Sequence, residues 1–367
     1  MNWLWGSKYT PIGLDIGTDT IKLAQLELSG PRPRVVALAQ RRMPELDEEA
    51  DEPQRSEQLK QAVAALLSES GVRGRQVTLC MNGTQVFVQN LRVPAGAEEQ
   101  LEGIVQTEAE QRLPGEFGEV EIRHLLAGEV RGTQHGGEPV ELKHEVIMLA
   151  CRRRDIESLI ALAERLRLKP QGLDVPQCAL ARVVTSTMRR KSDEHQCLLI
   201  LDLGASGTNV IVTRGQSVLM IKPLPIGGRL IDRQVAKRLD LSLPDAAALR
   251  QQCQDQPDQI EDELLRVVDE TVRAHMEALG REVIRCVRYH SVTFRGSRIA
   301  KALLFGGEAN QAVAGILARR IGITCELGDP FVGLELSDEL RRRVRLRRVG
   351  MWAVVLGLCT KARRVAA

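Results

Sequence analysis

Hydrophobic and polar residues alternate in two short segments that lie in opposite halves of the chain and resemble each other. Residues 12–23 are IGLDIGTDTIKL, and residues 199–212 are LILDLGASGTNVIV. In each segment an apolar strand leads to an aspartate, Asp15 or Asp202, and a turn rich in Gly, Ser and Thr leads into a second alternating strand. Alternation with a period of two around such a turn predicts a β-hairpin. The sequence therefore predicts two similar hairpins, with their aspartates 202 − 15 = 187 positions apart.

The rest of the pattern predicts an alternation of helices and strands. Helical periodicity covers residues 59–67, 97–112, 155–168, 178–188, 259–293 and 310–321, and strand patterns cover residues 77–81, 86–94, 120–126, 145–152, 170–175 and 302–305. The acidic stretch 45–52 and the Gly-rich stretch 128–137 predict a solvated loop and a long hairpin loop. Residues 349–359 are apolar over only about ten residues, too few to span a bilayer, and predict a buried terminal helix.

These elements divide into four predicted regions. The first hairpin belongs to a region made of residues 1–81 and 170–196, which is interrupted by an inserted α/β module at residues 82–169. The second hairpin belongs to residues 197–227 and 301–367, which are interrupted by a helical region at residues 228–300. Two similar segments in one chain predict a duplicated domain with a ligand between the halves.

Composition excludes several classes of protein. A chain of 367 residues with 43% hydrophobic residues can fill two cores, whereas 3% aromatic residues and a net charge of +3 disfavour a nucleic-acid partner. Long apolar runs of about 20 residues and a signal-peptide core are both missing, so a cytoplasmic location is expected. The eight cysteines form no C-x-x-C pair and the six histidines no H-E-x-x-H motif, which argues against a zinc site or a disulfide framework.

Both predicted turns carry groups that bind phosphate and magnesium. Glycine lets backbone amides approach a phosphate, and hydroxyl groups add donors. The candidate residues are Gly17, Thr18, Asp19 and Thr20 in the first turn and Gly204, Ala205, Ser206, Gly207 and Thr208 in the second. Asp15 and Asp202 are expected to hold Mg²⁺ through water, and an Asx cap of the turn is the alternative role for either. Lys22 is expected to be solvated, with a role as phosphate ligand as the alternative.

In order and spacing, these elements resemble the actin-like ATPase superfamily, the fold shared by actin, sugar kinases and the cell-division protein FtsA. Asp15–Thr20 matches its first phosphate loop, Asp202–Thr208 its second, and Gly306–Gly307 the glycines that back the adenosine. The resemblance implies an α/β fold with two RNase-H-like halves around a cleft for ATP and Mg²⁺. The four regions then correspond to subdomains 1A, 1C, 2A and 2B, with 1C inserted as in FtsA.

Over nearly the whole chain the sequence resembles the PilM family of type IV pilus assembly proteins. The matching segments are Asp15–Lys22, Leu91–Pro94, Glu108–Pro114, Leu168–Leu180, Ile226–Gly228, Asp329–Phe331 and Ala353–Leu358. The resemblance implies an ATP-binding component of the inner-membrane assembly platform, located on the cytoplasmic face. It also implies binding to the N-terminal cytoplasmic tail of a PilN-like bitopic protein, contacts with other platform or motor proteins, and self-association.

The resemblance assigns further nucleotide contacts to Gly227, Gly228, Arg250, Gly306, Gly307 and Glu308. Two positions depart from the FtsA-like pattern. Where relatives carry A-E-x-x-K, this chain has Ala247 in place of the acid and Arg250 in place of the lysine. The adenosine loop ends in Glu308, whose carboxylate could contact the ribose hydroxyls or repel the α-phosphate.

Several roles remain open on the sequence alone. Asp174 ends a strand that in relatives carries the residue polarising the attacking water, and capping is its alternative role; at most a slow ATPase is expected. The competing functions are a sugar or acetate kinase, an FtsA-like filament-forming protein, and a pseudo-ATPase scaffold of a related type II secretion or competence system.

The basic run Arg341–Arg348 predicts a solvated helix face, with an anionic membrane contact as the alternative. Trp3 and Trp5 are expected to pack onto the domain rather than to enter a bilayer interface.

Overall fold

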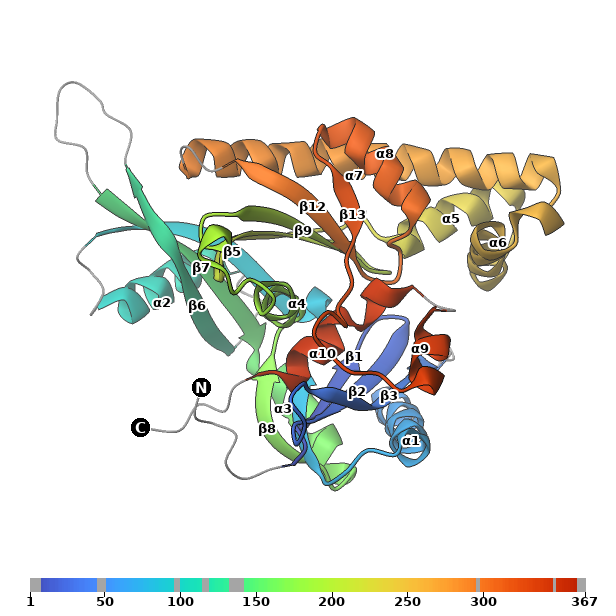
Figure 1. The fold of residues 1–367 in the computed structure, drawn as a ribbon, viewed down its shortest axis with the longest axis horizontal. Helices are drawn as coiled ribbons and strands as arrows, with labels where there is room; N and C mark the ends of the chain where they lie inside the picture. Colours follow the sequence, from blue (N-terminus) through green and yellow to red (C-terminus); the bar gives the residue numbers. More distant parts are fainter. Residues whose placement is uncertain are drawn as a thin grey trace.

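The structure is a computed structural model that describes residues 8–44, 51–95, 100–113, 119–131, 142–294, 298–345 and 348–361. It contains two five-stranded sheets, which form the centres of two halves, and a three-stranded sheet beside them (Figure 1). Trp3, Trp5 and most of the acidic stretch 45–52 fall outside the described residues. Within the described residues, no helix is both long and apolar enough to cross a membrane.

The two large sheets have the same strand order. The first is β3-β2-β1-β4-β8, formed by β1 (Ile12–Ile16), β2 (Thr20–Glu27), β3 (Arg34–Arg42), β4 (Gln76–Cys80) and β8 (Lys169–Asp174). The second is β11-β10-β9-β12-β13, formed by β9 (Cys197–Leu203), β10 (Thr208–Arg214), β11 (Ser217–Leu224), β12 (Ile299–Phe305) and β13 (Cys325–Leu327). In both sheets the hairpin strands pair antiparallel and the last two strands join in parallel. Both predicted hairpins and the predicted duplication are confirmed.

Helices cover both faces of the first sheet. On one face α1 (Glu52–Ser70) and α3 (Arg153–Arg165) pack against β1, β2 and β4. On the other face lie α4 (Pro176–Thr185), α9 (Asp338–Arg345) and α10 (Ala353–Cys359). Helix α3 lies in the range predicted for the module, and α10 lies in the range predicted for the second half. Both helices nevertheless pack on the first half. Their apolar side chains are buried in the cores of the first half, and the order of elements along the chain does not reveal this packing.

Helix α1 begins earlier than the periodicity predicted. It starts at Glu52 because Asp51 is its N-cap, whose side chain accepts a hydrogen bond of 2.8 Å from the amide of Gln54. Pro53 fits the first turn, where a missing amide hydrogen costs no helical hydrogen bond. The end of the acidic stretch is therefore helical and not a loop.

Glycine permits α10 to approach α4 closely. A Cβ added at Gly357 would lie 2.0 Å from the carbonyl oxygen of Ala179. We expect Gly357→Ala to lower the free energy of unfolding by about 1–3 kcal/mol, because overpacking forces backbone or side-chain shifts. The matched control is Gly315→Ala in α8 (Gln311–Ile321), where the nearest atom would be 3.6 Å away; it should be neutral or stabilise the helix. Urea unfolding of both variants measures the difference, and equal stabilities would contradict the packing argument.

The second sheet is covered on one face by helices of the second half. Buried side chains of α5 (Gly228–Leu239), α6 (Leu243–Asp255), α7 (Asp262–Thr293) and α8 form one core with β9, β10 and β12. Helix α7 has 32 residues and is therefore about 48 Å long. It runs along the second sheet from α5 and α6 at one end to the three-stranded sheet at the other (Figure 1).

The inserted module has two packed faces. Its strands β5 (Val86–Pro94), β7 (Leu142–Arg152) and β6 (Val120–Arg131) lie in the order β5-β7-β6. Val146 and Met148 face α2 (Leu101–Arg112), whereas Ile147 and Leu149 join a core with β11 and the end of α7. Strand β6 continues to Arg131, so the prediction of a loop beginning at residue 128 is wrong; residues 132–141 lie outside the described part.

A buried carboxylate also ties the module to the second half. Glu145 on β7 is fully buried and accepts hydrogen bonds from Arg92 Nε, at 2.9 Å, and from the Tyr289 hydroxyl on α7. Arg92 Nη2 also donates to the Thr293 hydroxyl at 2.9 Å. The module is therefore part of the shared core and not an appendage of the first half.

Candidate functional site

The tips of the two hairpins face each other. We call residues 16–20 the first tip and residues 203–208 the second tip. The Thr18 hydroxyl on the first tip donates to the Ser206 hydroxyl on the second at 3.1 Å. Arg229, near the start of α5, donates to Asp19 Oδ1 at 2.7 Å and to the Thr18 carbonyl at 3.1 Å. The structure thus brings together the predicted residues of both turns, with Arg229 as an additional contact between the halves.

The two predicted metal carboxylates lie behind these tips. Asp15 is buried on β1 and Asp202 is partly buried on β9. Burial raises the pKa of Asp15, and Lys22, 3.7 Å away, opposes this shift. Burial also raises the pKa of Asp202, an effect that Asn209 and Lys22 oppose and Asp15 adds to. The two carboxylates therefore repel each other, with one lysine as counter-ion.

Lys22 is not solvated, so that prediction is wrong. Its side chain is 13% exposed and faces Asp15 across the hairpin, where the two residues are register partners. The D-x-G-x-x-x-x-K spacing places the lysine opposite the aspartate in an antiparallel hairpin, a consequence of strand register that single-residue arguments overlook.

A second polar group that the sequence reasoning missed orients Asp202. Asn209 pairs with Asp202 in register and donates to its Oδ2 at 3.1 Å. The fully buried Gln177 on α4 in turn donates to Asn209 Oδ1 at 2.9 Å. The relay connects α4 of the first half to the second carboxylate. A polar residue directly across the hairpin from Asp202 was the available signal for Asn209, whereas no sequence pattern pointed to Gln177.

Some residues that were predicted to donate to phosphate also make hydrogen bonds within the turns. The amide of Gly17 donates to the Thr20 carbonyl at 3.0 Å, and the amide of Gly204 donates to the Gly207 carbonyl at 2.9 Å. The Thr208 hydroxyl donates to the Ile226 carbonyl at 2.7 Å. These three groups shape the tips, and a contact of their residues with phosphate stays a prediction. The hydroxyls of Thr18 and Ser206 lie at the tips themselves.

The start of α5 is fixed against the second tip. The amides of Gly228 and Arg229 donate to the carbonyls of Gly204 and Ala205 at 3.1 and 2.8 Å. A Cβ at Gly227 would lie 2.4 Å from the amide nitrogen of Gly207, so a side chain has no room there. Glycine at position 227 is therefore required by the packing of α5 on the second tip, and the amide of Gly228 helps to hold the helix there.

In the predicted adenosine loop, Gly306 packs closely against the second sheet, whereas Gly307 has free space beside it. Gly306 has φ of +93°, and a Cβ there would lie 2.2 Å from the Leu203 carbonyl oxygen. Only glycine suits this left-handed, close approach. A Cβ at Gly307 would meet nothing within 4 Å. The loop thus presents open backbone at Gly307, directly before Glu308.

Glu308 takes part in a buried ion-pair network. Its Oε2 accepts from Arg250 Nη1 at 2.5 Å, and Arg250 Nε donates to Asp232 Oδ1 at 2.5 Å. Burial disfavours the charged Arg250, but its hydrogen bonds and attraction to Asp232 and Glu308 raise its pKa. Glu308 also lies against Gly228, where an added Cβ would be 2.2 Å from its Oε1. The Glu308 carboxylate is therefore already paired before any ligand is considered.

Arg348 is a site residue that the sequence reasoning missed. It ends the basic run that was predicted to be solvated, but its side chain is 19% exposed and reaches the Gly307 carbonyl, Gln254 and Glu308. Arg341 and Arg342 in the same run are exposed, as predicted. Burial lowers the pKa of Arg348, an effect that Glu308 opposes. Among the described side chains of this run, Arg348 is the one that reaches the loop of Gly307.

Asp174 ends β8 and has three partners. Its Oδ1 accepts from the Val175 amide at 2.9 Å and lies 3.5 Å from Lys361 Nζ, and its Oδ2 accepts from Arg182 at 2.8 Å. The first contact is with the amide of Val175, the N-cap residue of α4, and that helix has no side-chain cap, so the capping role also stays a prediction. A role in positioning water stays a prediction. Asp15, Cys80 and Asp174 are neighbours across β1, β4 and β8, and burial together with the surrounding carboxylates raises the pKa of Cys80 well above its usual value.

Comparisons with known proteins agree with this architecture. Residues 13–363 match the family described as type IV pilus assembly protein PilM. A chain in the structure of a PilM–PilN type IV pilus biogenesis complex is 22% identical, with a TM-score of 0.77 over 96% of this chain and 98% of that one.

Two further structures are similar at lower identity. The ethanolamine utilization protein EutJ from Carboxydothermus hydrogenoformans is 14% identical, with a TM-score of 0.53 over 98% of this chain and 91% of that one. A diol dehydratase-reactivating factor in nucleotide-free form is 10% identical, with a TM-score of 0.53 over 96% of this chain and 99% of that one. The predicted actin-like ATPase fold is confirmed. Because the family match covers almost the whole chain, this protein belongs to the family of the type IV pilus assembly protein PilM.

Proposed function

We propose that this chain is an ATP-binding component of the type IV pilus inner-membrane assembly platform, which binds the N-terminal tail of a PilN-like bitopic protein and links motor to platform. The match to the PilM family over residues 13–363 carries the proposal, and the likeness to a PilM chain from a PilM–PilN complex supports the partner. The protein would act on the cytoplasmic face of the inner membrane and reach the membrane through PilN.

The arrangement of the two tips supports a nucleotide phosphate site. Hydroxyl donors from both halves meet at Thr18 and Ser206, and two carboxylates with a single lysine lie behind them. Asp15 and Asp202 would hold a hydrated Mg²⁺, whose positive charge would offset their mutual repulsion and the charge of a phosphate. In the described part of the chain, no cluster of three or more His, Cys, Asp or Glu side chains is arranged to hold a metal. A water-mediated contact is therefore the mode that the two carboxylates suit.

The adenosine end fits a nucleotide only if Glu308 moves. Open backbone at Gly307 would back the nucleoside, as predicted, with Arg250 and Arg348 beside it. Because the Glu308 carboxylate is paired with Arg250 and lies against Gly228, a nucleoside would compete with this ion pair. Nucleotide affinity should therefore be moderate, and binding should be coupled to rearrangement of the network.

Turnover is expected to be slow. The best catalytic candidate, Asp174, is engaged by Val175, Arg182 and Lys361, and a carboxylate held in this way is a weak general base. We expect Mg·ATP binding by isothermal titration, with phosphate release below about 1 s⁻¹, the low end of ordinary enzyme rates. Faster release would favour a true kinase or ATPase, and undetectable ATP binding would favour the pseudo-ATPase scaffold.

For the partner, we propose that the PilN-like tail docks where the inserted module joins the first half. The chain passes from the first half into the module between β4 and β5, and it returns to the first half between β7 and α3. Arg153, at the return, has a half-exposed side chain. An extended tail gains main-chain hydrogen bonds but loses conformational entropy, so its Kd should be on the order of micromolar.

Point variants test this surface better than removal of the module. Deleting the module would expose the core that it shares with β11 and α7. Arg153→Glu should weaken binding of the tail peptide, whereas Arg285→Glu on α7, whose side chain is 74% exposed, should not. Equal affinities for the two variants would place the tail elsewhere, and ATP titration of the same samples keeps the two parts of the proposal separate.

A further inference from the structure

Arg229 links the two tips through its side chain. It lies in the first turn of α5, and its amide donates to the Ala205 carbonyl on the second tip at 2.8 Å. Its guanidinium reaches the first tip, where Nε donates to Asp19 Oδ1 at 2.7 Å and Nη2 donates to the Thr18 carbonyl at 3.1 Å. A cation of the second half is therefore placed at the tip of the first half.

The cations Lys22 and Arg229 differ in whether a ligand between the tips can reach them. Lys22 lies behind the tips, its side chain is 13% exposed, and its Nζ is 3.7 Å from Asp15 Oδ2. Its charge also acts on Asp202, where it opposes the rise in pKa that burial causes. The Arg229 side chain, in contrast, is 44% exposed. Of the two, Arg229 is therefore the cation that a phosphate group between the tips can contact.

The present partner of Arg229 is easily replaced. The Asp19 side chain is 45% exposed, and an ion pair between exposed side chains contributes little stability. Both Nε and Nη2 of Arg229 approach the same oxygen, Asp19 Oδ1, at 2.7 and 2.6 Å. A terminal phosphate carries more negative charge than a carboxylate and offers a separate oxygen to each nitrogen. Such a phosphate should therefore displace Asp19 from the guanidinium.

On the basis of the proposed ATP-binding function, we propose that Arg229 distinguishes ATP from ADP. When ATP binds, the guanidinium exchanges Asp19 for the terminal phosphate. ADP with its nucleoside at the same loop ends one phosphate group earlier, so it leaves Arg229 paired with Asp19. Arg229 is then the specificity-determining residue of the phosphate site, and Asp19 competes with the ligand for its charge.

This exchange alters the contact between the two halves. Asp19 follows β1 of the first sheet and Arg229 belongs to α5 of the second half, so their ion pair joins the halves. ATP would replace this direct pair with a contact to its own phosphate, whereas ADP would leave the pair intact. The contact between the halves therefore responds to the terminal phosphate and not merely to the presence of a nucleotide.

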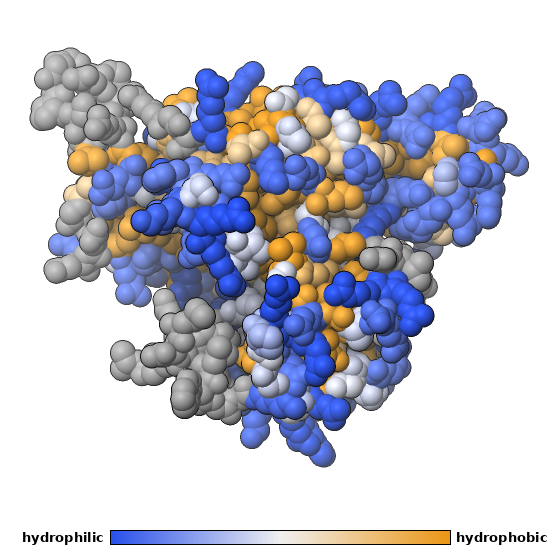
Figure 2. All heavy atoms as spheres, in the orientation of Figure 1, coloured by the Kyte–Doolittle hydropathy of each residue, from blue (hydrophilic) through white to orange (hydrophobic). Residues whose placement is uncertain are grey.

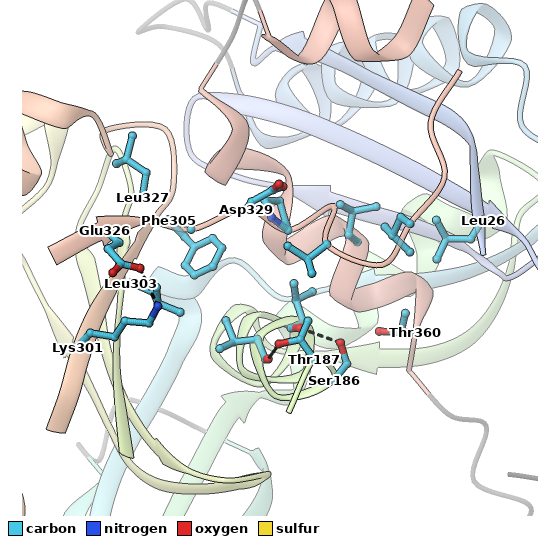
Figure 3. A pocket seen from close by; sticks show the side chains of 17 residues that line it. Leu26, Ser186, Thr187, Lys301, Leu303, Phe305, Glu326, Leu327, Asp329 and Thr360 are labelled. Atoms are coloured by element: carbon cyan, nitrogen blue, oxygen red, sulfur yellow. Dashed lines mark hydrogen bonds and ion pairs between the residues drawn. The ribbon is translucent and has the colours of Figure 1, made fainter. Parts of the chain in front are cut away.

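A pocket between the two halves is a poor competing site for phosphate (Figure 3). Its volume of about 270 Å³ is below the roughly 300–1,000 Å³ typical of small-molecule sites. Its lining in the described part of the chain contains one cation, Lys301, which pairs with Glu326 at 2.7 Å. Leu327 and Val332 at its rim are 45% and 58% exposed, and Figure 2 shows hydrophobic surface on this face. These features suit apolar groups, so ATP is not expected to bind there.

A second pocket is positively charged and supplies the control. It has a volume of about 240 Å³ and lies between α7 and α8, where its lining includes Arg273, Arg319 and Arg320. All three arginines are exposed, so they attract polyphosphates through screened charge without distinguishing one from another. Arg319→Met removes one such exposed arginine, and its effect on ATP and ADP should therefore be similar.

Isothermal titration of the full chain with Mg·ATP and with Mg·ADP tests the proposal through the ratio of the two dissociation constants. Arg229→Met should weaken ATP binding by about fivefold to tenfold, because a charge-assisted phosphate contact is lost. It should change ADP affinity by less than about threefold, the scale of a screened charge. Asp19→Asn should strengthen ATP binding by about threefold and leave ADP binding nearly unchanged, because the competitor loses its charge. Arg319→Met should preserve the ratio.

Other results would overturn the proposal. An unchanged ratio in Arg229→Met, with folding verified by thermal melting, would mean that Arg229 does not contact the terminal phosphate, while the ATP-binding function would stand. Weaker ATP binding by Asp19→Asn would mean that Asp19 itself holds the ligand, which contradicts the exchange. An equal change of the ratio in Arg319→Met would assign the effect to general charge. Absence of binding of either nucleotide to the unchanged chain would overturn the proposed ATP-binding function together with this inference.

Discussion

Arg250→Met is expected to lower the free energy of unfolding by about 3–5 kcal/mol, because it leaves buried charges without their partner. Arg250 has a side chain only 7% exposed and holds Asp232 and Glu308 at 2.5 Å each. Methionine preserves much of the apolar volume of the arginine side chain. The loss of stability therefore measures mainly the effect of the unpaired Asp232 and Glu308 carboxylates. Arg348, 3.7 Å from Glu308, can compensate only one of the two carboxylates. Urea unfolding at neutral pH measures the effect.

The matched control for this prediction is Arg233→Met on α5, at an exposed arginine of the same helical region. It should change the free energy of unfolding by no more than about 0.5 kcal/mol, as is usual for surface substitutions. Adding Asp232→Asn to Arg250→Met should restore part of the stability, because it removes one of the two buried carboxylate charges that lost their partner. If Arg250→Met were as mild as the control, the network would be a surface feature and not a buried one.

Asp202→Asn is expected to weaken Mg·ATP binding by about tenfold or more, equivalent to about 1.4 kcal/mol, while it stabilises the ligand-free protein. The carboxylate acts on the nucleotide through Mg²⁺, which an amide replaces poorly. Asn209 can still donate to the amide oxygen, so the hydrogen bond of the hairpin is preserved. Titration with Mg·ATP measures the loss, and thermal melting without ligand measures the gain.

The pH dependence of this gain follows from the direction of the pKa shift. Burial raises the pKa of Asp202 in the folded protein, and Asp15 raises it further. The folded state therefore binds the proton more tightly than the unfolded state, and the stability due to this group falls as pH rises from about 3.9, the unfolded value, through the raised folded value. The stabilisation by Asp202→Asn should be complete above that range and small below about pH 4.

Asp240→Asn is the control for both measurements. Asp240 is exposed in the left-handed position that ends α5, where asparagine is equally tolerated. It should change neither ATP affinity nor the stability profile. If Asp202→Asn bound Mg·ATP as tightly as this control, the assignment of the second carboxylate would be wrong.

Local sequence patterns predicted the elements and their order well. Period-two alternation around Gly-rich turns predicted both hairpins, and helical periodicity predicted α7 within three residues of its start. These features succeed because strand alternation, turn chemistry and helix periodicity depend on neighbours in the sequence. Helix starts were less accurate, as with α1, because an N-cap such as Asp51 lies outside the periodic part.

Contacts within the site were predicted only in part. The duplication indicated that residues of both tips would converge, and Thr18 and Ser206 do meet. The pairing of Lys22 with Asp15 follows from hairpin register and could have been inferred. The approach of Arg348 could not, because 348 − 250 = 98 positions separate it from Arg250 and its direction depends on how α9 and α10 pack.

By itself, the sequence determined the duplicated hairpins, the two-half architecture and the family, since these depend on local patterns and their order along the chain. Only the tertiary structure decided that α3 and α10 complete the first half, that the inserted module packs on the second, and that Glu308 is held by Arg250 and Arg348. The physical reason is that burial and charge pairing are properties of surfaces brought together by folding. A buried ion pair between distant residues leaves no periodic trace in the sequence, whereas a strand or a turn does.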